Sequence, residues 1–141
     1  MRIISWIILT IVALLIVAGG AASAGIAYFA SASSDMIVGS TNLDDLQVSA
    51  EVSNALRGRR GTAAAYALGF GCLMLWVILG PYRKGAVWAW WAILCSTLFL
   101  TVPLMLRMPA LGTTQGANVG LLILIVVVVG LLLDARRLSA R

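Results

Sequence analysis

The chain has 141 residues, of which 62% are hydrophobic and only 11% are charged, and its net charge is +5. Soluble domains carry about 25% charged residues, so this composition argues against a water-soluble globular protein. The basic residues stand at the ends of long apolar runs instead of forming one patch. This placement argues against nucleic-acid binding and favours a membrane protein with positively charged loops.

The first apolar run extends over residues 3–30. It is long enough to cross about 30 Å of hydrocarbon with some tilt, so we expect a transmembrane helix. The basic Arg2, the apolar core and the small residues Ala22, Ser23 and Ala24 also fit a secretory signal peptide with a cleavage site, which is the alternative interpretation.

Residues 31–60 form the main polar segment, which we expect on the extracytoplasmic side. It holds four of the five acidic residues of the chain: Asp35, Asp44, Asp45 and Glu51. Asn42 followed by Asp45 resembles a helix N-cap with its capping partner, which predicts a short extramembrane helix. One side of that helix would carry Val48, Val52, Ala55 and Leu56. The helix would either rest on the bundle or membrane surface, or dock a partner subunit. Gly58 and Gly61 predict a break after it.

Three further apolar runs predict transmembrane helices over residues 62–79, 86–106 and 116–133. Gly80 and Pro81 are expected to close the second helix, because proline lacks a backbone N–H. Pro103 predicts a local kink near the end of the third helix. Residues 107–115 are expected to form a short polar connection to the fourth helix.

The turn between the second and third helices carries residues typical of a membrane surface. Charged side chains are costly in hydrocarbon, and tryptophan prefers the boundary between membrane and water. The predicted interfacial anchors are Arg83, Lys84, Trp88, Trp90 and Trp91.

The distribution of positive charge predicts the orientation. With the N-terminus inside, six basic residues lie inside and four lie outside. The first helix also resembles a signal-anchor, and this orientation places all five tryptophans at the inner interface. We therefore expect both termini in the cytoplasm.

Small residues recur at four-residue spacing in three of the predicted helices. Such residues let helix backbones approach closely within a membrane. The predicted helix-packing positions are Gly19, Ser23, Gly61, Ala65, Gly69, Gly116 and Gly120. They would serve either internal packing or, most of all in the first helix, docking onto another protein.

Several residue types and motifs on which catalysis, metal binding and ion-coupled transport commonly depend are missing from the sequence. There is no histidine, no carboxylate inside an apolar run and no paired-cysteine motif. Cys72 and Cys95 are expected to be buried, inert thiols. Five polar residues are expected to form ordinary interhelical hydrogen bonds: Thr10, Ser96, Thr97, Thr101 and Asn118. We therefore expect no catalytic residue, no cofactor and no metal site.

The hairpin Pro81-Tyr82-Arg83-Lys84-Gly85, followed by Trp88-Ala89-Trp90-Trp91, resembles the turn of uncharacterised small four-helix bacterial membrane proteins. Those proteins also carry a polar extracytoplasmic segment between their first two helices. The resemblance implies a bacterial inner-membrane location and implies no activity.

Together these features predict an all-α polytopic membrane protein. Its single domain, residues 1–141, would be an up-down bundle of four transmembrane helices with a short extramembrane helix after the first. Three functions remain open. The protein could be a non-catalytic accessory subunit that contacts membrane lipids and other membrane protein subunits. It could bind an apolar ligand such as a lipid, quinone or carotenoid, or it could form a small oligomeric channel or transporter.

Overall fold

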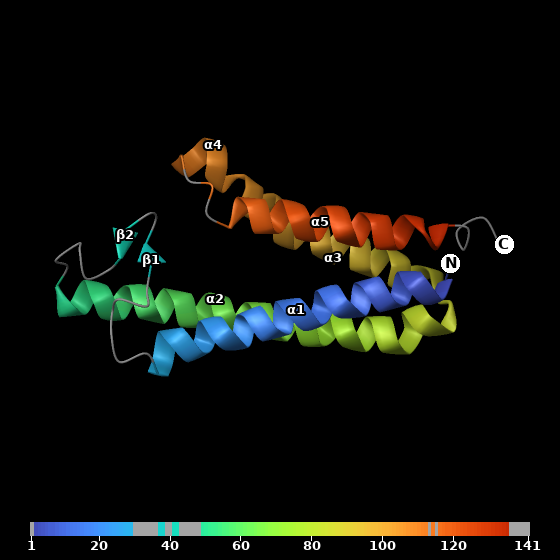
Figure 1. The fold of residues 1–141 in the computed structure, drawn as a ribbon, viewed down its shortest axis with the longest axis horizontal. Coiled ribbons are helices and arrows are strands. Elements are labelled where there is room, and N and C mark those ends of the chain that lie inside the picture. The colour runs from blue at the N-terminus through green and yellow to red at the C-terminus, as the bar shows by residue number, and fades with distance from the viewer. Residues whose placement is uncertain are drawn as a thin grey trace. The chain divides into compact units, whose positions relative to one another are not determined.

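The computed structural model describes residues 2–29, 37–38, 41–42, 49–112, 114 and 116–135. The regular secondary structure of these described residues is helical apart from one short antiparallel strand pair (Figure 1). Three helices are long and apolar enough to cross a membrane, at Ile3–Phe29, Ala50–Tyr82 and Val87–Ala110, and a shorter apolar helix covers Ala117–Leu132. Long apolar helices were the central prediction from the sequence, and they are confirmed.

The first helix, α1 (Arg2–Phe29), agrees with the predicted bounds to within one residue at each end. The predicted helix start at Asn42 is wrong, because Asn42 lies in a strand. That strand, β2 (Thr41–Asn42), pairs antiparallel with β1 (Ile37–Val38), with Ile37 opposite Asn42 and Val38 opposite Thr41. Asp45 and Val48 lie outside the described residues.

The second helix, α2 (Ala50–Val77), begins twelve residues earlier than predicted and runs unbroken through Gly58 and Gly61. The expected separate extramembrane helix is therefore wrong as far as residues 50–60 are concerned. Ser49 accepts a hydrogen bond at its Oγ from the backbone N–H of Val52 (3.4 Å), which caps the new start. Glycine costs only about 1 kcal/mol inside a helix, so two glycines among good helix formers do not end it.

Pro81 does not close the second helix, contrary to the prediction. The chain widens into a π-helical turn, η3 (Ile78–Tyr82), and the helical conformation persists to Lys84. The wider turn uses hydrogen bonds to the carbonyl five residues back, such as that from the Arg83 N–H to the Ile78 carbonyl, and so makes room for a residue that lacks a donor. Gly85, with φ of 101°, makes the reversal instead.

The third helix, α3 (Val87–Met105), continues through Pro103 and stops only at Leu106. A further helical segment, α4 (Arg107–Leu111), occupies part of the predicted polar connection, so that prediction is wrong at its start. Gly112 ends α4 in the left-handed conformation with φ of 64°. The last helix, α5 (Ala117–Leu132), matches the predicted span to within one residue at each end.

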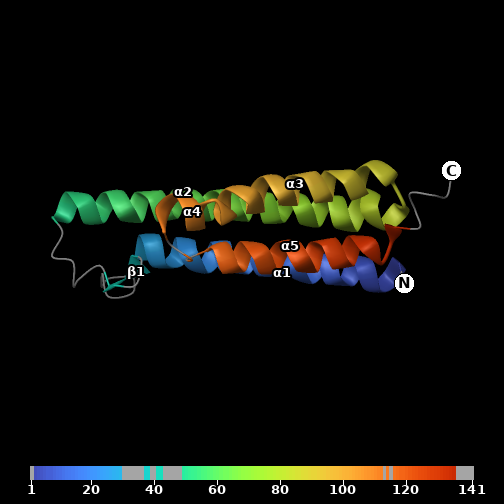
Figure 2. The same ribbon diagram turned by 90° about the horizontal axis from the view of Figure 1, so that it is seen from above.

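The chain forms two compact units. Unit 1 comprises Met1–Leu14 and Leu73–Arg141, and unit 2 comprises Leu15–Cys72. In unit 1, α3 and α5 pack side by side and antiparallel (Figure 2), since Trp90 meets Leu131 at one end and Leu104 meets Gly120 at the other. The buried side chains of this unit include Leu9, Ile78, Ile93, Val127 and Leu131.

In unit 2, the second half of α1 packs against α2 through small residues. A Cβ on Gly20 would lie 3.1 Å from the Leu68 backbone nitrogen and 3.2 Å from the Ala64 carbonyl oxygen. The ring of Tyr28 lies directly over Gly61, where a larger residue would collide with it. Both contacts are possible because the glycine at each of them has no side chain: Gly20 admits the backbone of α2, and Gly61 admits the Tyr28 ring.

Candidate functional site

A buried cluster of polar groups lies at the C-terminal end of α5 in unit 1. We call it the polar junction, and define it as the side chains of Ser5, Tyr82 and Trp90 with the carbonyls of Gly130 and Leu131. Ser5 belongs to α1, Tyr82 to η3 and Trp90 to α3. The first turns of α1 and the η3–α3 hairpin, which are far apart in the sequence, therefore meet at the end of α5.

The Ser5 hydroxyl is fully buried and makes two short hydrogen bonds. It donates to the Gly130 carbonyl oxygen at 2.6 Å and lies 2.6 Å from the Tyr82 hydroxyl. A serine hydroxyl has one proton, and a carbonyl can only accept. Tyr82 therefore donates to Ser5, and the proton order runs from Tyr82 to Ser5 to Gly130.

Trp90 makes the second side-chain contact to the end of α5. Its indole Nε1–H donates to the Leu131 carbonyl oxygen at 3.0 Å, and the same carbonyl accepts the Asp134 backbone N–H at 3.1 Å. The last carbonyls of a helix have no α-helical donor, so buried helix ends need partners of this kind. Ser5 and Trp90 thus cap a helix end that lies inside the protein.

Gly130 permits the close approach that the Ser5 hydrogen bond requires. A Cβ at this position would lie 3.2 Å from Leu9 Cδ2 and 3.5 Å from Ile8 Cγ2. No sequence pattern marks Ser5 or Gly130. Neither belongs to a motif, and their role depends on segments 125 residues apart.

The predicted interfacial anchors divide into exposed and buried residues. Trp88 and Trp91 are 60% and 51% exposed, and Arg83 and Lys84 are exposed as well. Trp90 is only 7% exposed, because its indole packs inside unit 1. The guanidinium carbon of Arg83 lies 5.1 Å from the centroid of the Trp6 ring, a cation–π contact that joins the hairpin to the first turns of α1.

Three of the predicted helix-packing residues touch a neighbouring helix. Ser23 accepts a hydrogen bond from Arg60 Nε at 3.2 Å, Gly61 lies under Tyr28, and a Cβ on Gly120 would lie 3.3 Å from Leu104 Cβ. Gly116 serves a turn instead, with φ of 82° at the N-cap of α5.

The other predicted packing positions are open in the described part of the chain. Gly19 and Gly69 have no described atom within 4 Å of an added Cβ, and Ala65 is exposed. Their packing against another protein stays a prediction.

The expected interhelical hydrogen bonds are local ones in the structure. Thr10 donates to the Trp6 carbonyl, Ser96 to the Ile93 carbonyl and Thr101 to the Thr97 carbonyl, all within one helix. The buried Thr97 hydroxyl has no hydrogen-bond partner among the described residues, and Asn118 is exposed. Cys72 and Cys95 are free and exposed, so the prediction of buried thiols is wrong.

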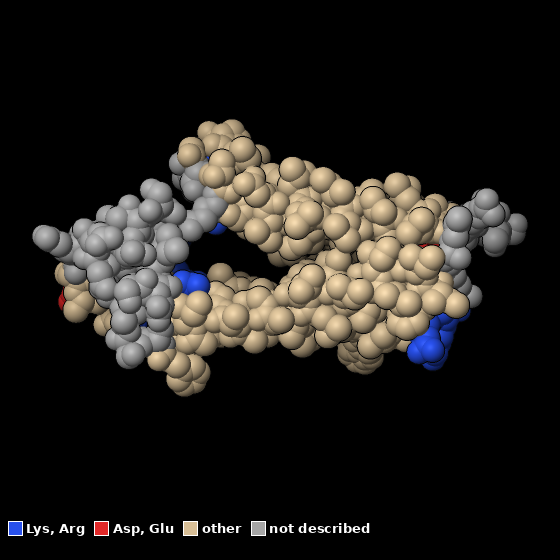
Figure 3. Space-filling view, viewed as in Figure 1, with Lys and Arg blue, Asp and Glu red and all other residues tan. Residues whose placement is uncertain are grey.

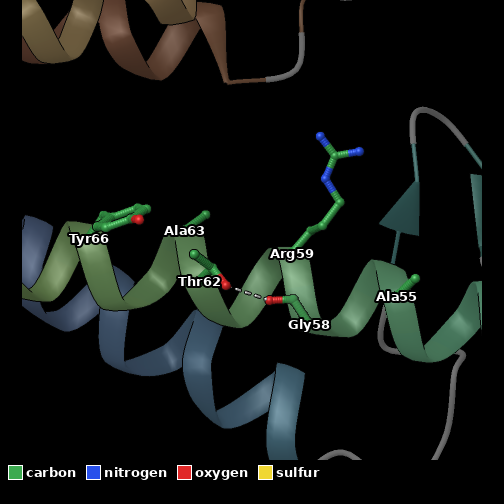
Figure 4. Close-up of a pocket in the computed structure, with 6 residues that line it drawn as sticks. All are labelled: Ala55, Gly58, Arg59, Thr62, Ala63 and Tyr66. Atoms are coloured by element: carbon green, nitrogen blue, oxygen red, sulfur yellow. Dashed lines mark hydrogen bonds between the residues drawn. The ribbon is translucent and has the colours of Figure 1, made fainter.

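Unit 2 carries a shallow, open depression of about 480 Å³ on one side of α2. We call this side the arginine face, and its lining residues are Ala55, Gly58, Arg59, Thr62, Ala63 and Tyr66. Figure 4 shows Arg59 and Ala63 pointing away from α1, which lies on the other side of α2. Thr62 Oγ1 donates to the Gly58 carbonyl at 3.0 Å and is thereby occupied within the helix.

The two features differ in what they can do chemically. The polar junction contains hydroxyls, an indole and carbonyls, and it suits structural hydrogen bonding. The arginine face presents a cation to an open space. Among the residues that the structure describes, no three histidine, cysteine or acidic side chains gather as metal ligands would.

No family model, curated protein or solved structure matches this chain. The resemblance of the hairpin to small four-helix bacterial membrane proteins therefore stays an expectation from the sequence.

Proposed function

We propose that this protein is a non-catalytic integral membrane protein that serves as an accessory, structural subunit of a larger membrane complex. Its four apolar helices would cross the membrane as an up-down bundle with both termini in the cytoplasm. The bacterial inner membrane is the location that the hairpin resemblance implies.

The distribution of polar and apolar side chains supports the membrane location. Phe99, Trp76 and Leu15 are 82%, 75% and 65% exposed, whereas the hydroxyls of Ser5 and Thr101 are fully buried. In the view of Figure 3 most of the described surface is uncharged. Helices that are apolar on every side are stable in hydrocarbon, where exposed apolar groups cost nothing and polar groups must be satisfied internally.

The helix lengths also fit a bilayer. At 1.5 Å per residue, the 28 residues of α1 rise about 42 Å, which exceeds the ~30 Å hydrocarbon core and allows for tilt. The 16 residues of α5 rise about 24 Å, which a locally thinner bilayer accommodates.

The observation that carries the accessory role is an uncovered small-residue side of α1. Ala18, Ala21 and Ala22 are exposed, and Gly25 has no described atom within 4 Å of an added Cβ. These residues follow one side of the helix, whereas Gly20 on another side is already packed against α2. Small residues on an open side let a second helix approach to backbone contact, which drives association in lipid.

Co-purification tests this role. The full chain, extracted in mild detergent, should bring larger membrane subunits at fixed stoichiometry, and Ala22→Leu should release them. Val119→Leu adds bulk at an exposed position of α5 and is the matched control, which should retain the complex. A monodisperse chain that carries an extractable lipid, quinone or carotenoid would instead favour the apolar-ligand alternative, and an ion-conducting homo-oligomer would favour the channel.

Cysteine labelling tests the membrane topology. In a Cys72→Ser, Cys95→Ser background, a cysteine at Asn54 should react with an impermeant maleimide from outside intact cells. A cysteine at Ser139 should react only after permeabilisation. The opposite pattern would reverse the orientation.

A further inference from the structure

Two opposite sides of α2 in unit 2 have different surroundings. At about 100° per residue, Arg60, Gly61, Ala64 and Leu68 share one side, and this side meets α1 through Ser23, Tyr28 and Gly20. The arginine face is centred about 180° away from it. The depression therefore lies on the side of α2 that α1 does not cover.

Arg59 is the main polar group that this face offers to a ligand. It is exposed, and no hydrogen bond or ion pair joins it to another residue within the described ranges. Arg60, by contrast, is already bonded to Ser23. Glu51 lies on the same side of α2 but eight residues away, about 12 Å along the helix axis. A guanidinium presents five N–H donors and no acceptor, an arrangement that fits phosphate oxygens.

The position of Arg59 along the helix matches the level of lipid phosphates. The continuous helix Ala50–Tyr82 is followed by the basic pair Arg83 and Lys84, which marks one membrane boundary. Counting back the roughly 20 residues that cross the hydrocarbon core places the opposite boundary near Ala63. Arg59 then lies one turn, about 6 Å, outside the hydrocarbon, within the headgroup layer.

We propose that the arginine face binds the phosphate of an anionic phospholipid headgroup. Arg59 would contact the phosphate oxygens, and the small side chains of Ala55 and Gly58 leave space for the headgroup. An acyl chain would run past Ala63 and beside the exposed ring of Tyr66. This inference rests on the proposed membrane location, but it is independent of the accessory role.

Native mass spectrometry of the full chain in detergent tests the proposal. The chain is titrated separately with phosphatidylglycerol and phosphatidylcholine, and the bound fraction of each lipid is measured. We expect tighter binding of phosphatidylglycerol. Arg59→Gln should weaken it about fivefold, the effect of one basic residue near an anionic surface, and should leave phosphatidylcholine binding unchanged.

Arg57→Gln is the matched control, because it removes the same charge two residues away on a different side of α2. It should change phosphatidylglycerol binding less than twofold. Equal losses in the two variants would show a diffuse attraction and would overturn the site, as would the lack of any preference between the two lipids.

Two further measurements distinguish a lipid on this face from a small phosphate compound and from a second copy of the chain. Glycerol 1-phosphate, a headgroup without tails, should not displace phosphatidylglycerol at equal concentration, and displacement would overturn the lipid assignment. Loss of a dimer in Arg59→Gln with unchanged lipid binding would assign the face to a second copy of the chain.

Alkaline extraction of cell membranes distinguishes a failure of the membrane location from a failure of the lipid site. Release of the chain by this treatment would overturn the membrane location and the lipid site together. Retention of the chain without a lipid preference would overturn the lipid site alone.

Discussion

In unit 1 the polar side chains Ser5, Tyr82 and Trp90 lie inside the protein and are hydrogen-bonded to one another or to the end of α5. In unit 2 the polar group Arg59 lies on the surface and has no partner among the described residues, although the neighbouring Arg60 is bonded to Ser23. Hydrogen bonds that satisfy buried groups serve the fold, whereas an exposed and unengaged cation can serve a ligand. In a chain with few polar residues, this contrast distinguishes polar groups that stabilise the fold from polar groups that are available to a ligand.

The largest effect that separates the two units should come from adding bulk at a glycine. Gly130→Leu places a side chain against Leu9 and Ile8 in unit 1 and forces Ser5 away from its carbonyl acceptor. We expect a loss of about 3 kcal/mol in the free energy of unfolding, measured by SDS titration in mixed micelles.

Gly69→Leu is the matched control in unit 2, where no described atom lies within 4 Å of an added Cβ. Its unfolding free energy should stay within about 0.5 kcal/mol of the parent, the usual range for open surface positions. An equal loss in both variants would show that Gly69 lies at a close helix contact after all.

A smaller effect should follow from removing one hydroxyl in each unit. Ser5→Ala removes the buried hydroxyl that bonds to the Tyr82 hydroxyl and to the Gly130 carbonyl, which should lower the unfolding free energy by about 1–2 kcal/mol. Ser23→Ala breaks a part-buried bond whose other partner, Arg60, is long and flexible, so we expect about 0.5 kcal/mol or less.

The double variant Ser5→Ala, Tyr82→Phe sharpens this test. If the two hydroxyls form one chain, the loss in the double variant should be smaller than the sum of the single losses. Strictly additive losses would mean that the hydroxyls act independently and would contradict the hydrogen bond between them.

The smallest effect should distinguish the two kinds of tryptophan at the hairpin. Trp90→Phe removes the N–H that caps Leu131 and some buried ring area, which should lower the unfolding free energy by about 1 kcal/mol. Trp88→Phe changes a ring that is 60% exposed, so the unfolding free energy in the same SDS titration should stay unchanged within error. A larger loss for Trp88 would reverse the assignment of buried and interfacial rings.

The sequence predicted the bounds of a helix well where the ends of an apolar run mark them. The bounds of α1 and α5 were predicted to within one residue at each end. The strand pair was not predicted, although the dipeptide Gly39-Ser40 between Ile37-Val38 and Thr41 is of a type that hairpin sequences favour. The continuous α2 was missed because a local break was inferred from glycines that a long helix tolerates.

What the sequence determined by itself is the apolar character and approximate position of the long helices, the bounds of α1 and α5, and the chain reversal near the basic pair Arg83 and Lys84, since these depend on residues close together in the chain. The tertiary structure decided which sides of the helices meet. Because α3 and α5 are apolar all around, their sequences contain no amphipathic signal to mark a buried side. The burial of Trp90, the meeting of Ser5 with Gly130 and the opposite environments of Arg59 and Arg60 all follow from contacts between distant segments, which periodicity along one helix cannot specify.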